Sequence, residues 1–214
     1  MSTLEADWTE AAEDRLLEAA VRLAPQFGWT GRLVARAATA AGLSEGEAML
    51  VAPGGARDLA ALFCRRHDRA ALTALADIDP AKLKVRARIA RAAEARLEAA
   101  AADGEATRRW AGQLALPHNA ALAARLLWTT ADLLWRWAGD RATDENHYSK
   151  RLILAGILAP ALAIRLNAGP DAARDYLATQ IDRVMAYERF KANIRPADLA
   201  HNVAATLGRA RYGA

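Results

Sequence analysis

The stretch that decides the fold is RLLEAAVRLAPQFGWTGRLVARAATAAGLS, residues 15–44. Its first part predicts an amphipathic helix over about residues 9–27, because apolar side chains recur there at helical spacing. Gly28 ends this helix, and a second one covers about 32–41. Ser44 is a good N-cap for a third helix. We therefore expect three short helices joined by tight turns.

The remainder of the chain also shows helical patterns, and no strand pattern of useful length is present. Alanine and leucine are abundant, and both lose little entropy on entering a helix. Breaks at proline, glycine or a capping residue predict that further helices begin near residues 57, 80, 105, 117, 143, 171 and 196. We expect an all-α protein of about ten helices.

The charge balance and the single cysteine give limited information about the binding partner and the cellular compartment. The formal net charge is +4, which suits an acidic surface such as nucleic acid, anionic lipid or an acidic partner without choosing among them. Cys64 is the only cysteine, so we expect a reducing compartment and no internal disulfide. Residues 1–13 lack the apolar segment of a signal peptide. The longest apolar run, 152–164, is shorter than the roughly 20 residues of a membrane span, so we do not expect the chain to cross a membrane.

The N-terminal helices resemble the helix-turn-helix module of TetR-type repressors. The phase of the apolar residues over 15–44 and the Ala-Gly-Leu-Ser turn at 41–44 carry the resemblance. The next segment, 45–56, departs from it, because it holds Glu45 and Glu47 but no Tyr, His, Lys or Arg. Lysine and arginine neutralise DNA phosphates, and polar donors read bases. We expect the module to serve as a packing scaffold and do not expect it to bind DNA.

The most distinctive stretch is TTADLLWRWAGDRATDENHYSKRLILAGILAPAL, residues 129–162. Within it, residues 137–151 read Trp-Ala-Gly-Asp-x-x-Thr-Asp-x-Asn-x-Tyr-x-Lys-Arg. This pattern is similar to a signature of the family of the ninth named coenzyme Q (ubiquinone) biosynthesis protein, which has a TetR-like fold. One departure is His147, where family members often have tryptophan.

The resemblance implies a lipid-binding accessory protein that is not an enzyme, with no cofactor and with bound lipid or quinone as its ligand. Family members bind isoprenoid lipids and ubiquinone intermediates and present substrate to the di-iron hydroxylase that acts on demethoxyubiquinone. For this chain we expect a degenerate helix-turn-helix module over 1–56, a lipid-binding and dimerisation body over 57–194, and an amphipathic helix over 195–214. The expected location is the cytoplasm, with peripheral attachment to the inner membrane.

The resemblance also implies that the surface around the signature contacts the hydroxylase. At helical spacing, Asp144, His147, Tyr148 and Arg151 fall along one face of a helix. A tyrosine among polar side chains is typical of an interaction hot spot, although the spacing alone also fits an ordinary solvated helix start. The expected partner-binding residues are Asp144, Asn146, His147, Tyr148, Lys150 and Arg151.

Two apolar segments are candidates for the wall of a lipid pocket. Residues 152–166 are apolar almost all round, which is typical of a helix that is buried or that lines an apolar cavity. The preceding helix offers a facing apolar wall, and ligand pockets are mostly apolar. A plain core or a dimer interface fits the same pattern. The expected lipid-binding residues are Leu126, Leu127, Leu133, Leu134, Trp137, Leu154, Ile157 and Leu158.

The last helix is expected to lie on a surface. Leu199, Val203 and Leu207 fall at i, i+4 and i+8, so they can contact a bilayer or pack on the body of the protein. A homodimer is expected from the resemblance to TetR proteins, with the helix over 171–193 supplying the apolar stripe.

Two other functions fit the residues. A TetR-like, ligand-responsive transcriptional regulator would hold an effector in the same cavity, whereas an interaction scaffold would have a filled core. No metal site is expected, because Asp144 with His147, and Asp198 with His201, have metal-like spacing only near exposed helix starts.

Overall fold

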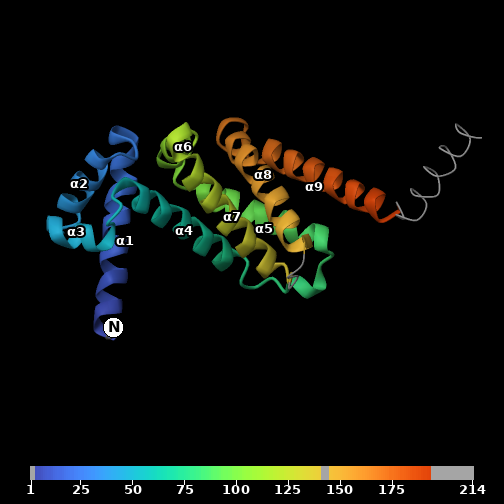
Figure 1. The fold of residues 1–214 in the computed structure, drawn as a ribbon, viewed down its shortest axis with the longest axis horizontal. Helices are drawn as coiled ribbons and strands as arrows, with labels where there is room; N and C mark the ends of the chain where they lie inside the picture. The colour runs from blue at the N-terminus through green and yellow to red at the C-terminus, as the bar shows by residue number, and fades with distance from the viewer. Residues whose placement is uncertain (1–2, 141–144, 194–214) are drawn as a thin grey trace, which may run out of the picture. The chain divides into compact units, whose positions relative to one another are not determined.

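The computed structural model describes residues 3–140 and 145–193, and the side chains of 8–140 and 147–186. These residues form nine α-helices and two short 3-10 turns, with no strand among them (Figure 1). The expected all-α class is therefore confirmed, while the TetR-like arrangement stays a prediction. The chain divides into two compact units, 1–177 and 178–214, and α1 to α8 lie in the first. The predicted boundaries at 56 and 194 stay predictions.

The N-terminal helices are α1 (Thr3–Phe27), α2 (Gly31–Ala40) and α3 (Glu45–Val51). α1 packs against α2 and also contacts α3, α4 and α6. Gly28 ends α1 in a left-handed backbone conformation with φ of +62°, which favours glycine because it lacks a Cβ atom. α1 begins at Thr3, before the expected start near residue 9. Residues 3–8 include leucine, glutamate and alanine, which are good helix formers.

Ser44 caps α3, as its sequence position predicts. Its hydroxyl accepts a hydrogen bond from the Glu47 backbone N–H at 3.2 Å, and the Glu47 carboxylate accepts one from the Ser44 N–H at 2.8 Å. This reciprocal pair satisfies two backbone donors that a helix start otherwise leaves open. The side-chain hydrogen bond from Ser44 holds the pKa of Glu47 below its ordinary value. One of the two acidic groups on this helix therefore stabilises the helix itself.

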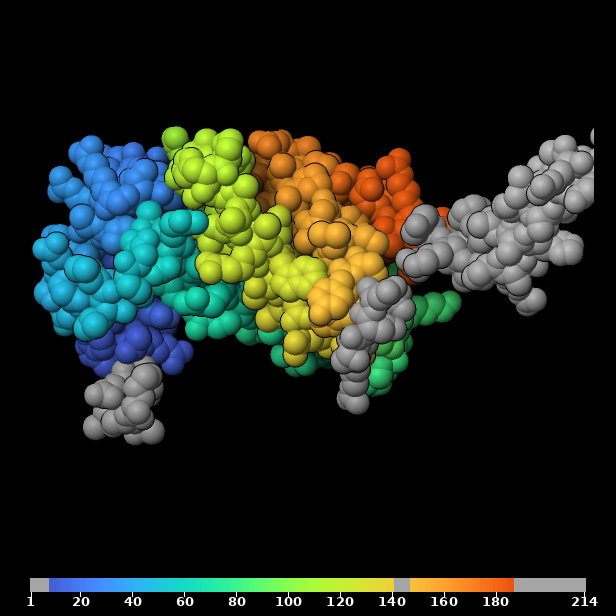
Figure 2. Space-filling model, in the orientation of Figure 1, coloured from blue at the N-terminus to red at the C-terminus, as the bar shows by residue number. Residues whose placement is uncertain are grey.

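The body of the first unit consists of five helices: α4 (Ala56–Ala74), α5 (Val85–Ala101), α6 (Gly104–Leu114), α7 (Ala120–Trp137) and α8 (Glu145–Ala168). α4 leads from the N-terminal helices into this body (Figure 1) and packs against α5 and α7. α8 packs against α7 and α5. Figure 2 shows α7 (yellow-green) and the start of α8 (orange) next to each other on one face. α9 (Pro170–Asn193) begins in the first unit and continues into the second.

Two prolines begin 3-10 turns where the sequence predicts longer helices. Pro80–Lys82 is a turn in which the Asp79 carboxylate accepts from the Ala81 N–H, and α5 starts only after it. Pro117–Asn119 likewise precedes α7. Proline at a first turn has no N–H to satisfy, so it suits a short turn as well as a helix start. The predicted helix starts at 80 and 117 are therefore a few residues early.

An aromatic cluster joins the N-terminal helices to the body. The Phe63 ring lies 4.5 Å from that of Trp29 and 5.8 Å from that of Trp110, measured between centroids. The Trp29 indole N–H donates to the Ala106 carbonyl at 2.9 Å, and that of Trp110 donates to the Ala60 carbonyl at 3.0 Å. These contacts connect the turn between α1 and α2 with α4 and α6, so the N-terminal helices share one core with the body.

Candidate functional site

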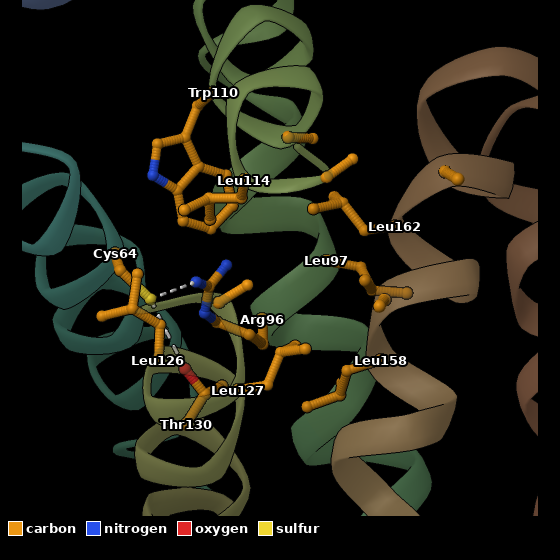
Figure 3. Close-up of a pocket in the computed structure, with 15 residues that line it drawn as sticks. Cys64, Arg96, Leu97, Trp110, Leu114, Leu126, Leu127, Thr130, Leu158 and Leu162 are labelled. Atoms are coloured by element: carbon orange, nitrogen blue, oxygen red, sulfur yellow. Dashed lines mark hydrogen bonds between the residues drawn. The ribbon is translucent and has the colours of Figure 1, made fainter. Parts of the chain in front are cut away.

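A cavity of about 300 Å³ lies among α4, α5, α6, α7 and α8 (Figure 3). Most of its wall is apolar, and Trp110, Leu97, Leu126 and Leu158 supply large side chains from four helices. Pockets for small molecules have this composition, and this volume is at the small end of their range. The cavity fits a compact, mainly apolar ligand or part of a longer one.

The cavity has a buried end and an open end. The buried end consists of Cys64, Arg96 and Thr130, whose side chains are buried on α4, α5 and α7. The mouth is lined by Ala115 and Ala159, which are exposed. In Figure 3 the three residues of the buried end lie together, away from Leu158 and Leu162 of α8. All three polar residues of the wall are thus at the end remote from solvent.

Three of the eight expected lipid-binding residues line the cavity, namely Leu126, Leu127 and Leu158. The other five do not line it. Leu134, Leu154 and Ile157 are buried elsewhere and Leu133 and Trp137 are half-buried. The cavity meets α7 between Ala123 and Thr130, so side chains nearer the end of that helix lie beyond it.

Arg96 belongs to a buried polar network that the sequence analysis did not single out. Its Nε donates to the Asp68 carboxylate at 2.6 Å, and its Nη2 donates to the Cys64 sulfur at 3.4 Å. The Thr130 hydroxyl also donates to Asp68, at 3.0 Å. Burial raises the pKa of the Cys64 thiol, which keeps it neutral. A usable signal was the position of Arg96 on the alanine-rich, buried face of α5.

His67 forms a second network beside the first. Its Nε2 lies 2.9 Å from the Asp103 carboxylate, which also accepts from Arg66 at 3.2 Å. The His67 Nδ1 is buried and has no hydrogen-bond partner among the described residues. Burial and the positive charge of Arg96 lower the pKa of His67 to about 4, from an ordinary value of 6.5. The imidazole is therefore neutral near pH 7.

The stability of the fold is expected to fall as the pH drops from about 6.5 to about 4. In this window the unfolded chain binds a proton at His67 that the folded chain does not bind. Neutral His67 makes its full contribution to the free energy of unfolding above pH 6.5, the pKa of the unfolded chain. This contribution is lost as the pH falls toward about 4, the pKa in the folded chain, by at most about 1.4 kcal/mol per pH unit for one proton. Urea denaturation across the window measures it. His67→Gln, which keeps a donor for Asp103, should flatten the slope, and an unchanged slope would refute the assignment.

A cluster on the outer surface, which we call the aromatic patch, consists of Trp128, His147 and Tyr148. The Trp128 and Tyr148 rings stack with centroids 6.0 Å apart, and the His147 ring meets Tyr148 edge-on at 5.1 Å. Tyr148 is 63% exposed, and Leu152, one turn further along α8, is 67% exposed. Large exposed aromatic and aliphatic side chains are typical of protein-binding surfaces.

The structure places Arg151 differently from the sequence expectation. Its side chain is only 2% exposed, so it is not on the outer surface with Tyr148. The guanidinium donates to Asp132 at 2.6 Å and to Asp140 at 3.0 Å. Two carboxylates from the preceding segment thus draw Arg151 inward, where it ties α8 to α7.

Lys150 and the remaining expected residues have mixed positions. The Lys150 ammonium donates to Asp140 at 2.8 Å and lies 5.4 Å from the centroid of the Trp135 ring, so it is engaged within the protein. Other expected contacts lie outside the described residues and stay predictions: Asp144, the side chain of Asn146, and Leu199, Val203 and Leu207 of the last expected helix.

One stretch of α8, His147–Ala168, is long and apolar enough to cross a membrane by length and composition alone. The continuous helix extends beyond the apolar run that the sequence analysis considered. Core helices of soluble proteins pass the same test, and α8 packs against two other helices and carries the buried Arg151. Within the described residues, no group of three or more His, Cys, Asp or Glu side chains is placed to hold a metal ion.

The outer face of α3 lacks DNA-reading chemistry. Met49 and Leu50 are its exposed large apolar side chains, Glu45 is an exposed carboxylate, and Glu47 is engaged with Ser44. None of these groups donates a hydrogen bond to a base or neutralises a phosphate. This geometry does not favour a DNA-binding regulator.

The chain is similar to known proteins, and a family model matches it over α7, α8 and most of α9. Residues 120–188 match the COQ9 family model. Over 169 residues the chain is 30% identical to the mitochondrial ubiquinone biosynthesis protein COQ9 of Bos taurus, and over 171 residues it is 29% identical to that of Homo sapiens. Each match covers 76% of this chain and 53% of the relative. COQ9-B of Xenopus laevis is 27% identical over 175 residues. The chain therefore spans about half the length of the curated relatives it matches.

Proposed function

We propose that the chain is a COQ9-type protein and that it serves ubiquinone biosynthesis as a lipid-binding accessory protein without catalytic activity of its own. It holds an isoprenoid lipid or a quinone intermediate and presents it to the di-iron hydroxylase of the pathway. The cavity among α4 to α8 is the observation that carries this proposal, because a protein acting only as a scaffold needs no apolar space of about 300 Å³ in its body.

The wall of the cavity supports an isoprenoid ligand. Leucine and alanine side chains from α7 and α8 offer the dispersion contacts that a branched hydrocarbon chain needs. The exposed alanines at the mouth leave room for a tail longer than the cavity to pass out between α6 and α8. A short tail segment is therefore enclosed while the rest extends toward solvent or membrane.

Mass spectrometry of the natively purified protein tests the lipid part of the proposal. We expect an isoprenoid lipid or quinone to co-purify, and we expect Ala159→Trp to reduce its occupancy at least several-fold by blocking the mouth. Gly156→Trp is the matched control, since position 156 lies on the same helix, is exposed, and has open space beside it. Wild-type protein that carries no lipid and binds no added quinone would refute the proposal.

The aromatic patch supports contact with a protein partner. Tyr148 is exposed and stacked on Trp128, so it is held in place before a partner arrives, which lowers the entropy cost of binding. His147 and Leu152 extend the same surface. We assign the hydroxylase contact to this patch.

Binding to the purified hydroxylase tests that assignment. Tyr148→Ala is expected to weaken the complex about 10-fold or more, as loss of a hot-spot aromatic does. Leu116→Ala, at another exposed apolar residue, is the control and should leave binding unchanged. Equal affinity of the two variants would place the hydroxylase contact elsewhere.

The proposal also includes peripheral attachment to the inner membrane and a homodimer. The curated relatives are mitochondrial proteins, which agrees with a place in the ubiquinone pathway. Flotation with liposomes and light scattering test these two points.

A further inference from the structure

Arg96 is the only charged residue among the described side chains that line the cavity. It is buried and comes from α5, whose other buried residues are all aliphatic. An arginine in an apolar wall is costly unless its donors are satisfied. Its position at the buried end therefore calls for a partner for each donor.

The protein satisfies only part of this donor set. A guanidinium has five N–H groups. Among the described residues its hydrogen-bond partners are the Asp68 carboxylate for Nε and the Cys64 sulfur for Nη2, and sulfur at 3.4 Å is a weak acceptor. Figure 3 shows the guanidinium extending into the space below Trp110 and Leu114. An acceptor atom of a ligand in that space can complete the set.

The charge of this end is already balanced. Asp68 lies 2.6 Å from Arg96 and compensates its positive charge, and the neighbouring Arg66 is paired with Asp103 at 3.2 Å. A phosphate placed here would face Asp68 in a medium of low dielectric, where like charges repel strongly. A neutral oxygen acceptor meets the remaining donors without this cost.

We propose that Arg96 holds the uncharged, oxygen-bearing head of the ligand, a quinone or phenol ring, at the buried end, so that the isoprenoid tail leaves through the mouth. This inference rests on the proposed lipid-binding function. Arg96 acts as the specificity-determining donor, and Asp68 selects against anionic heads. The size of the cavity agrees with a ring and a short stretch of tail enclosed together.

Competition between three probes for delipidated wild-type protein tests the inference. The probes are a short-chain ubiquinone, an isoprenoid hydrocarbon of the same tail length and the corresponding isoprenyl monophosphate, with occupancy measured by native mass spectrometry. We expect the quinone to be preferred over the hydrocarbon about 10-fold, the factor that one hydrogen bond from a charged donor supplies. The monophosphate should bind no better than the hydrocarbon.

Arg96→Lys should abolish this preference, because lysine keeps a positive charge beside Asp68 but loses the forked donors. Leu97→Met is the matched control, since it changes a neighbouring wall residue at nearly constant volume. It should shift the occupancy of both neutral probes together and leave their ratio unchanged. A preference that survives Arg96→Lys would overturn the role of Arg96.

The wild-type outcomes separate the inference from the proposed function. Equal binding of quinone and hydrocarbon, or a preference for the monophosphate, would overturn the inference and leave lipid binding intact. Binding of none of the three would overturn both. If Arg96→Lys fails to fold, the wild-type protein can be photolabelled with a quinone that carries a photoreactive group on its ring. The labelled peptides then show where the ring binds. Labelling of peptides around Cys64 or Arg96 supports the inference, and labelling confined to Ala159 and its neighbours on α8 overturns it.

Discussion

Replacing Arg151 by methionine is expected to destabilise the folded protein by about 3–5 kcal/mol, the usual cost of removing one partner from a buried ion pair. The Arg151 side chain is 2% exposed, and its guanidinium donates to Asp132, Asp140 and the His147 carbonyl. Methionine fills similar space but leaves the two carboxylates without this donor. Urea denaturation followed by circular dichroism measures the loss.

Arg136→Met is the control for this prediction. Arg136 binds the other oxygen of Asp132, also at 2.6 Å, but its side chain is 71% exposed. Exposed ion pairs contribute about 0–1 kcal/mol because water screens them and the long side chain loses entropy. The two variants therefore differ in burial and not in distance. Equal losses of stability would show that Arg151 is not a structural tie between α7 and α8.

Replacing Arg151 is also expected to affect the aromatic patch, the proposed partner surface. Partial burial raises the pKa of Asp140, but the hydrogen bonds from Lys150 and Arg151 outweigh it and hold that pKa below its ordinary value. Arg151 also binds the backbone carbonyl of His147, in the first turns of α8. Loss of Arg151 is thus expected to loosen the support of the aromatic patch and to weaken hydroxylase binding together with stability.

Phe63→Ala is expected to cost about 3–5 kcal/mol, as large-to-small changes of a buried phenylalanine do. The ring is fully buried, and its centroid lies 4.5 Å from Trp29 and 4.2 Å from His67. Its removal opens a cavity at the junction of the N-terminal helices and the body. The unfolding midpoint in urea should fall markedly, with a single transition retained.

Leu50→Ala on the exposed face of α3 is the control, and surface changes of this kind stay within about 0.5 kcal/mol. A Phe63→Ala variant that unfolds in two separate transitions would be informative in another way. It would show that the aromatic cluster alone couples the first three helices to the body.

The sequence by itself determined the helical class and much of the local structure. Alanine and leucine at helical spacing sufficed for the helices, and Ser44 with Glu47 sufficed for the start of α3, because both depend on residues within one or two turns. The signature over 137–151 led to the family and to Tyr148, whose exposure the structure agrees with. These features depend on residues that are close in the sequence, so they can be predicted from one sequence alone.

The tertiary structure decided which apolar residues face empty space and which charges are buried. Leu127 lines the cavity while Leu133 and Leu134 do not, and all three have the same chemistry. They differ because the neighbouring helices approach α7 at some positions and not at others. The spacing of apolar residues along α7 carries no information about these positions. Burial of a charge likewise depends on a partner far away in the chain: Arg96 needs Asp68, 28 residues before it, and Arg151 needs Asp132, 19 residues before it. Helix periodicity reports a face and its polarity, but only packing brings a second helix to that face and determines whether an arginine there meets water or a carboxylate.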